Sequence, residues 1–335
     1  MGRHHPDDLS FSGTAYAAVT AWNNTRALRP PSASEDPSAI EALNQAQTHS
    51  NPDQTLRVWR LLKLSPLSIV FCLLMTIWMP IGARAQAGPP FLSNDPGTPG
   101  NGNWEINIAS AQSISRAVTS YQVPQLDVNF GLGDRIQLTY EVPYVIETQA
   151  GQPHQSAWGN AFPGVKWRFL DQGEGNWQAS IFPQVETNGL ASAQRKDIAV
   201  AGPRWLLPLE VTKRLGPLDV DFEAGYYLPK QGVRERILGL VTGRSLSDRL
   251  DLAVELYNDH AIGAPPDQTT LDLGGRFKLT RGFIALFMAG RSVSGTTNGP
   301  VFIGYFGIQI LLSDYGRALE REDTAGRAAT SPLDQ

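Results

Sequence analysis

The sequence predicts an all-β fold: an up-and-down antiparallel transmembrane β-barrel of about 12 strands. From Asn103 to Leu312, apolar and polar residues alternate, as in Leu218-Asp219-Val220-Asp221-Phe222-Glu223. Side chains two residues apart lie on the same face of a strand, so each segment has one apolar face and one charged face. Short and long connections follow each other along this region, and an export signal precedes it. Together these three observations are typical of a barrel in a bacterial outer membrane.

The composition is compatible with such a barrel and excludes several other classes of protein. Mean hydropathy is −0.22 and hydrophobic residues make up 41% of the 335 residues, which resembles a soluble protein. Lumen and loop residues dilute the lipid-facing ones in a barrel, so these values do not exclude it. The net charge of −4 gives no basic surface for nucleic acid. The single cysteine, Cys72, lies in the predicted export signal, so the mature chain would have no disulfide and no cysteine metal site.

The export signal is predicted at residues 57–87. It consists of three basic residues, an apolar run over residues 64–79, and an A-x-A site with cleavage after Ala85 or Ala87. A single membrane anchor is the alternative for this run. A signal normally begins at the N-terminus, so residues 1–56 are predicted to be either a disordered extension or a mis-assigned start, with translation beginning near Val58.

The remaining chain divides into three predicted parts. Residues 88–102 are expected to be a periplasmic N-terminal segment, and residues 103–312 form the barrel. Residues 313–335 are rich in charge and alanine and are expected to be a flexible tail.

Each predicted strand shows the two-residue period, and none of the long segments after the signal shows helical periodicity. The predicted strands are Trp104–Gln112, Val123–Leu132, Arg135–Ile146, Phe162–Leu170, Trp177–Thr187, Pro203–Thr212, Leu218–Leu228, Val233–Arg244, Leu250–Asn258, Thr270–Thr280, Phe283–Val293 and Val301–Leu312.

The connections predict the orientation of the barrel. Short turns rich in Gly and Asp, such as residues 132–134, alternate with longer loops at residues 147–161, 188–202 and 259–269. Outer-membrane barrels have tight periplasmic turns and longer outer loops. We therefore expect the short turns at the periplasmic rim and the long loops at the outer rim.

Prolines provide a second expectation, because proline cannot donate to a strand ladder and a closed barrel has no edge strand. Seven prolines are therefore predicted to lie near the long-loop rim, and Pro208 is predicted to mark a local break. The seven are Pro124, Pro143, Pro163, Pro183, Pro203, Pro229 and Pro300.

Aromatic residues next to the short turns are expected to form the periplasmic girdle. Phe130, Phe169, Trp177 and Phe283 fall on the outward parity there. Three tyrosines are expected near the opposite rim: Tyr144, Tyr226 and Tyr227.

Charged residues on the inward parity are the candidate functional set. They should pair across the lumen, because an unpaired charge in a narrow space is costly. For the acidic trio Asp219, Asp221 and Glu223 we expect a basic neighbour such as Arg204 or Arg244. Two interpretations remain open, a salt-bridged scaffold and a polar translocation path. The candidate lumen-lining residues are Asp127, Glu141, Lys166, Arg168, Glu186, Arg204, Glu210, Asp219, Asp221, Glu223, Asp251, Glu255, Asp272, Arg276 and Lys278.

Catalysis, cofactors and metals are not predicted. After the signal only His154 and His260 are present, and neither accompanies a G-x-S-x-G motif. No His-x-x-x-His pair or calcium loop occurs.

Several segments are similar to a known family. Residues 88–96, 103–106, 124–135, 142–144 and 158–170 resemble motifs of the outer-membrane proteins called "MetA-pathway of phenol degradation". The resemblance covers about residues 88 to 312, and its motifs are structural. It implies an outer-membrane barrel that transports aromatic or other hydrophobic compounds, and it brings no catalytic residues.

The function predicted from these observations is passive transport of small molecules through the outer membrane of a Gram-negative-type bacterium. The alternatives are a plugged barrel with a structural or adhesive role, and a secreted soluble β-protein. The expected partners are the lipid bilayer, the outer-membrane assembly machinery and a small-molecule solute; nucleic acid is not expected.

Overall fold

Backbone groups that face lipid must find hydrogen-bond partners within the protein, and the alternating segments achieve this by closing into a barrel. The computed structural model describes residues 88–149, 151–171, 177–187, 189–199, 202–229, 234–262, 267–295 and 301–312. Its sheet consists of β1 (Trp104–Ile114), β2 (Val118–Leu132), β3 (Ile136–Gln149), β4 (Gln155–Trp158), β5 (Phe162–Asp171), β6 (Trp177–Ile181), β7 (Gln184–Glu186), β8 (Arg204–Leu215), β9 (Leu218–Pro229), β10 (Glu235–Ser245), β11 (Leu250–Ala261), β12 (Gln268–Lys278), β13 (Phe283–Ser294) and β14 (Phe302–Leu311).

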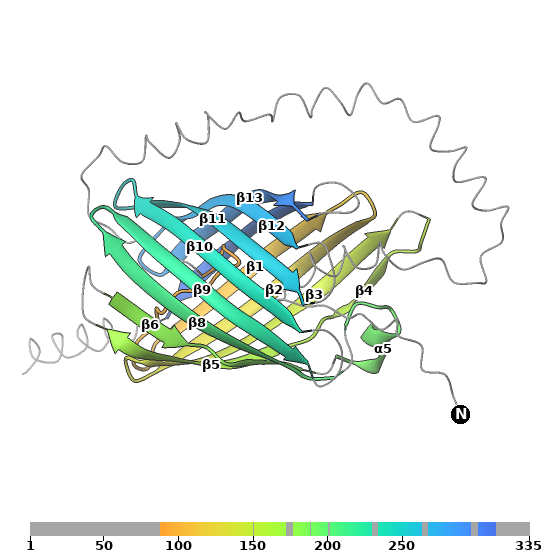
Figure 1. Ribbon diagram of the computed structural model, residues 1–335, viewed down its shortest axis with the longest axis horizontal. Helices are drawn as coiled ribbons and strands as arrows, with labels where there is room; N and C mark the ends of the chain where they lie inside the picture. The colour runs from red at the N-terminus through yellow and green to blue at the C-terminus, as the bar shows by residue number, and fades with distance from the viewer. Residues whose placement is uncertain are drawn as a thin grey trace, which may run out of the picture. The chain divides into compact units, whose positions relative to one another are not determined.

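The sheet is closed and has up-and-down topology. Neighbours in sequence are neighbours in the sheet, and β1 pairs with β14 from Glu105 opposite Leu311 to Ile114 opposite Phe302. Strands β4 and β5 both pair with β3, and β6 and β7 both lie between β5 and β8. Each of these two pairs is one interrupted strand, so the wall has twelve strands, as predicted. Figure 1 shows the tilted strands from the side.

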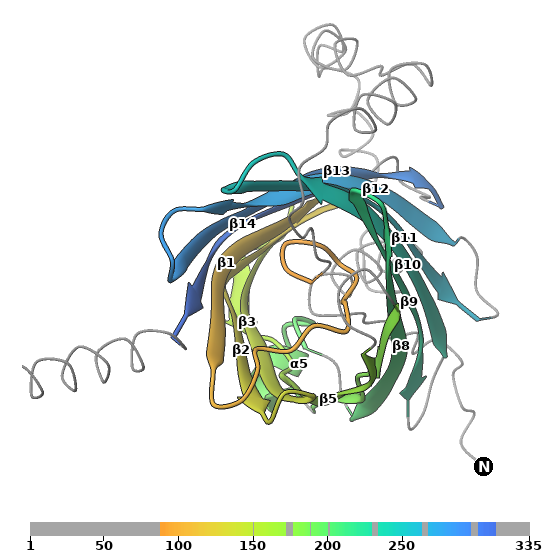
Figure 2. The same ribbon diagram turned by 90° about the vertical axis from the view of Figure 1, so that its left-hand side faces the viewer.

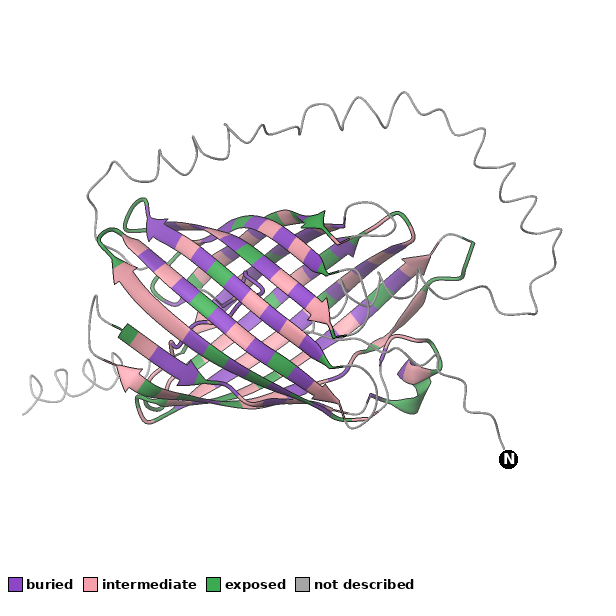
Figure 3. Ribbon diagram, in the orientation of Figure 1, coloured by how far each residue is buried: buried purple, intermediate pink, exposed green. Residues whose placement is uncertain are grey.

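Burial alternates along the strands and separates an outer from an inner face (Figure 3). In β10, Leu240 is exposed, whereas Ile237 and Val241, on the opposite face of the same strand, are buried. Large apolar side chains are exposed on nearly every strand, and many buried side chains are charged. Soluble proteins rarely expose so much apolar surface, whereas a barrel in lipid requires it.

The connections follow the predicted alternation with two exceptions, one of which is the connection between β9 and β10, residues 230–234, which is as short as the one between β5 and β6. The turns after β2, β8, β10 and β12 are short, but β1 and β2 are also joined by only residues 115–117, at the opposite rim. Both strands are longer than predicted, because β1 continues to Ile114 and β2 begins at Val118. The loop between β7 and β8 contains the short helix α5 (Ala191–Gln194).

The prediction that seven prolines lie at one rim was wrong. Pro203 and Pro229 lie at the rim, and Pro300 is outside the described residues. Pro124 and Pro143, however, lie inside β2 and β3, where the β2 register shifts between Gln122 and Gln125. A bulge leaves a residue unpaired, so it accommodates proline within the wall.

The aromatic residues next to the short turns face outward. Phe169, Trp177 and Phe283 are exposed, and the ring of Phe130 lies 4.6 Å from that of Trp104. At the opposite rim Tyr226 faces outward, whereas Tyr227 is fully buried and faces the lumen.

The predicted extension (residues 1–56), signal (57–87) and tail (313–335) lie outside the described residues. In the described part of the chain, no helix is long and apolar enough to cross a membrane.

The outward face gives a test of stability. Leu240, at the middle of β10, is 45% exposed, and Leu215, at the turn-proximal end of β8, is 56% exposed. We expect Leu240→Arg to lower the free energy of unfolding by about 2–4 kcal/mol and Leu215→Arg by about 0–1 kcal/mol, because arginine is costly at the bilayer midplane and tolerated near the interface. Urea titrations of the barrel in phospholipid vesicles measure both losses. Equal losses would contradict a membrane that surrounds the middle of β10.

Candidate functional site: the lumen and the segment within it

The chain before β1 turns back into the barrel from the short-turn rim (Figure 2). We call residues 88–98 the lumen segment. The backbone crosses β2 closely, with the Gly102 N–H 2.9 Å from the Gly131 oxygen and the Gly131 N–H 3.0 Å from the Asn103 oxygen. A Cβ at Gly131 would lie 1.8 Å from the oxygen of Gly100, so this crossing requires glycine. The segment was predicted to be periplasmic, and its residues 88 and 90–93 are instead buried inside the barrel.

Glu255 on β11 holds the middle of the lumen segment. Its carboxylate accepts hydrogen bonds from the N–H of Leu92 at 2.9 Å, the N–H of Ser93 at 2.7 Å and the hydroxyl of Ser93 at 2.6 Å. Gly239, on neighbouring β10, leaves the space that Ser93 occupies, because a Cβ there would lie 1.9 Å from Ser93 Oγ. Hydrogen bonds to a charged acceptor are about twice as strong as neutral ones, so this contact fixes the segment in the lumen.

Three further wall residues hold the lumen segment. Glu223 on β9 accepts from the N–H of Asn94 at 3.1 Å. The Lys166 ammonium donates to the backbone oxygen of Asp95, and Arg276 Nε donates to the oxygen of Pro89 at 3.1 Å. Carboxylates therefore bind the N–H groups of the segment, and cations bind its carbonyl groups.

Apolar contacts complete the attachment. Phe91 and Leu92 are buried in one cluster with Leu206, Ile237 and Leu286 of the wall. This burial covers apolar surface that would otherwise face water in the lumen, which favours the inserted position of the segment.

The remaining predicted charges form pairs with different partners. Arg204 Nε lies 2.7 Å from Glu186, Arg204 Nη1 lies 3.2 Å from Glu235, and the guanidinium stacks 4.8 Å from the ring of Tyr227. Lys166 lies 3.2 Å from Glu210. Arg204 thus contacts two carboxylates that sequence reasoning did not assign to it. A basic neighbour of the acidic trio on an adjoining strand is Arg214 of β8, which was not among the expected candidates.

The acidic trio has three separate kinds of partner. Asp219 pairs with Arg214 at 2.9 Å, the hydroxyl of Thr212 donates to Asp221 at 2.5 Å, and Glu223 binds the lumen segment. The two-residue period of β9 places the three carboxylates on one face. Their mutual repulsion is relieved by partners on β8 and on the lumen segment.

Four predicted residues remain, of which Asp272 lies directly opposite Glu255 on the neighbouring strand. Ser245 donates to Asp251, and Thr270 donates to Asp272 at 3.4 Å. Arg168 pairs with Asp171 at 3.3 Å near the short-turn rim, and Lys278 is partly buried at the end of β12.

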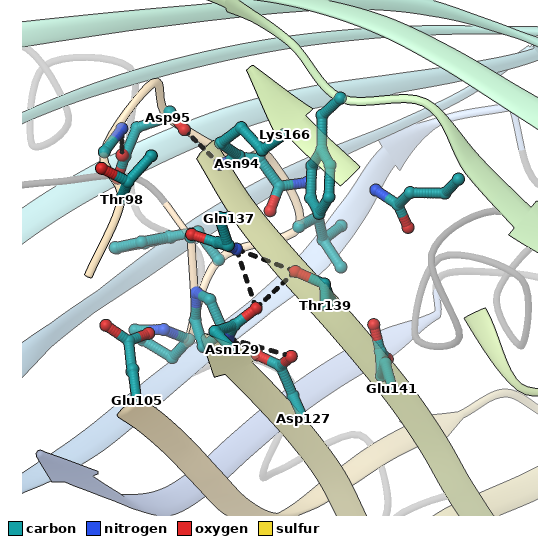
Figure 4. A pocket seen from close by; sticks show the side chains of 18 of the residues that line it. Asn94, Asp95, Thr98, Glu105, Asp127, Asn129, Gln137, Thr139, Glu141 and Lys166 are labelled. Atoms are coloured by element: carbon teal, nitrogen blue, oxygen red, sulfur yellow. Dashed lines mark hydrogen bonds between the residues drawn. The ribbon is translucent and has the colours of Figure 1, made fainter. Parts of the chain in front are cut away.

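A cavity of about 150 Å³ separates the lumen segment from β1, β2 and β3. Figure 4 shows Asp127 and Glu141 among the side chains that line it. Asn107 donates to Asp127 at 2.9 Å, and Gln125 donates to Glu141 at 2.8 Å. Glu105 lines the same cavity. This wall of the cavity is therefore made of carboxylates and amides.

Sequence reasoning missed the amides. Asn129 donates to Asp127 at 3.1 Å and accepts from Gln137 at 2.7 Å and from Thr139 at 2.5 Å. These residues share the inward parity of Asp127 and Glu141, and this parity could have identified them as lumen-lining residues. A search limited to charges overlooked them.

The two histidines lie near the long-loop rim. His154 Nδ1 is 2.8 Å from the hydroxyl of Thr148, and His260 pairs with Asp267. Among the described residues, no cluster of three His, Cys, Asp or Glu side chains is arranged to hold a metal ion.

A solved structure shares this fold, and others resemble it more distantly. The "COG4313 outer membrane channel from Pseudomonas putida F1" matches with a TM-score of 0.54 and 15% identity over 66% of this chain and 100% of that chain. The KdgM and NanC porins match with TM-scores of 0.43 and 0.45, at 9% and 7% identity, over 61% of this chain and 98% of theirs. No family model and no curated protein sequence matches. The chain therefore shares its barrel fold with the solved outer membrane channel.

The attachment of the lumen segment can be tested at Glu255. Glu255→Ala removes all three hydrogen bonds to Leu92 and Ser93, and we expect it to release the segment. A cysteine at the buried Pro96, in a chain whose only natural cysteine is Cys72, reports this release by reaction with a maleimide. We expect labelling at least about tenfold faster, because the loss of about 1.4 kcal/mol changes an equilibrium tenfold.

Asp251→Ala is the matched control, because Asp251 lies on the same strand and face but bonds to Ser245. Gly239→Val should release the segment by steric conflict with Ser93 and leave both carboxylates in place. Unchanged labelling in both Glu255→Ala and Gly239→Val would mean that these contacts do not hold the segment.

Proposed function

We propose that this protein is an outer-membrane channel for the passive passage of small molecules. The observation that carries the proposal is a closed barrel with an apolar outer face around a lumen of buried charged side chains. A purely structural barrel has no need of so many buried charges, because burying them costs free energy. The fold shared with a solved outer-membrane channel agrees with this function.

The lumen favours cations and neutral polar molecules over anions. Twelve carboxylate side chains but only three cationic ones are buried among the described residues. Rings of Asp and Glu select cations in channels, because the negative potential of the wall raises the local concentration of positive ions.

The lumen segment limits the size of what passes. It fills the middle of the barrel and is held by hydrogen bonds and apolar contacts, which are reversible. The same segment favours the second candidate function, a plugged barrel with a structural or adhesive role. The two functions differ in whether solute passes the segment.

We infer export by a cleaved signal at residues 57–87, insertion by the outer-membrane assembly machinery, and no enzymatic activity. Membership of the "MetA-pathway of phenol degradation" group rests on the resemblance of the motifs alone, since no family model matches.

Planar-bilayer recording separates the two functions. We expect a small single-channel conductance and, in a potassium chloride gradient, a reversal potential of the sign that marks cation preference. Deletion of residues 88–97 should raise the conductance several-fold, because it widens the lumen.

The Gly131→Val variant provides an independent check on the position of the lumen segment. A valine side chain on β2 would clash with the backbone of Gly100, just after that segment. This variant should also conduct more than the natural chain. If neither the natural chain nor the deletion conducts, the plugged structural barrel is the correct function. Anion preference would contradict the role of the carboxylates.

A further inference from the structure

Like charges face each other at three places on the lumen wall. Side chains directly opposite on neighbouring strands are close enough to interact, and like charges there destabilise a sheet. Each pair therefore needs a donor or a cation nearby. The three carboxylate pairs are Asp127 and Glu141, Glu210 and Glu223, and Glu255 and Asp272.

Two of these pairs bind other parts of the chain. Glu210 has an ion pair with Lys166 at 3.2 Å. Glu223 accepts from the backbone of Asn94, and Glu255 accepts from the backbone of Leu92 and Ser93. In both pairs, N–H groups of the lumen segment supply part of the compensation.

The third pair faces the cavity and has only neutral donors. Asp127 accepts from the amides of Asn107 and Asn129, and Glu141 accepts from the amide of Gln125. Neither carboxylate forms an ion pair with a described residue. Two carboxyl groups on adjoining strands thus line open space without forming an ion pair with any described residue.

Gln125 adds an independent observation. Its side chain is 8% exposed and lines the same cavity. Its Nε2 donates to Glu141, but its Oε1 has no hydrogen-bond partner among the described residues. A buried carbonyl oxygen without a donor costs free energy, so a ligand that donates to it is favoured. The cavity therefore offers three acceptors on one wall: two carboxylates and one amide oxygen.

We propose that this cavity binds a small organic cation through a primary ammonium group. An ammonium has three N–H donors and no acceptor, which matches the acceptors of Asp127, Glu141 and Gln125. Its charge compensates the carboxylate pair through charge-assisted hydrogen bonds. The volume of about 150 Å³ limits the ligand to a few heavy atoms.

The other charges of the cavity fix the orientation of the ligand. Lys166 and Arg276 also line it, and both donate to carbonyl groups of the lumen segment. Their positive charges repel an ammonium, so it binds at the wall formed by β2 and β3. A bare metal ion is a poorer match, because the described residues contain no cluster of three ligands suited to a metal.

The inference deepens the proposed function by naming a class of solute. Its role in transport rests on that function, but binding itself can be measured without flux. Isothermal titration of the full chain in detergent, with ethanolamine hydrochloride as the probe, measures binding directly. Ethylene glycol is the matched neutral probe, since a hydroxyl group replaces the ammonium.

We expect saturable binding of one ethanolamine and no measurable binding of ethylene glycol. Asp127→Asn and Glu141→Gln keep the shape of each side chain and should each weaken binding at least about tenfold, since each removes a charge-assisted hydrogen bond. Asp221→Asn is the control, because Asp221 is a buried lumen carboxylate bonded to Thr212 and not a lining residue of this cavity. It should leave binding unchanged.

The site is refuted if ethylene glycol binds as tightly as ethanolamine, if calcium chloride displaces ethanolamine stoichiometrically, or if both substitutions leave binding unchanged. If one of the two variants fails to fold, the other variant and the comparison of ethanolamine with ethylene glycol still show whether the site exists. Conductance without ethanolamine binding refutes the site and leaves the channel function intact. Ethanolamine binding without conductance supports the site and refutes the channel.

Discussion

Closure of the sheet between β1 and β14 is the constraint on which the rest of the structure depends. Lipid offers no hydrogen bonds, so every strand of the wall needs two neighbours, and closure provides them. Closure also sends every second side chain into a confined interior. Because those side chains carry charge, the interior must contain its own counter-charges and donors. The lumen segment and the internal ion pairs both follow from this requirement.

The interior meets that requirement in two ways. Near the long-loop end, Arg204 lies between Glu186 and Glu235, so side chains of the wall compensate each other. In the middle of the barrel, Glu223 and Glu255 bind backbone N–H groups of the lumen segment. In both parts of the lumen, the charged face therefore acts as a scaffold of internal ion pairs and hydrogen bonds.

The wall could be predicted from the sequence because it depends on a local, regular period. A strand such as β9 shows that period in six consecutive residues. Pro124 was misplaced because a bulge inside β2 permits proline, and a bulge leaves no periodic signal. The lumen segment was missed because it is irregular and its contacts are distant: Ser93 and Glu255 are separated by 162 positions. The partners of Arg204 could not be predicted from parity alone. Parity shows which face of the sheet a side chain lies on, but not the register that sets which residues of neighbouring strands lie opposite each other.

The contacts of the lumen segment also set an order of events during folding. The segment precedes β1, yet the residues that hold it belong to β5, β9, β11 and β12. It cannot take its final place until those later strands have joined the wall. An incomplete barrel therefore has an empty interior, and the first part of the described chain is the last to settle.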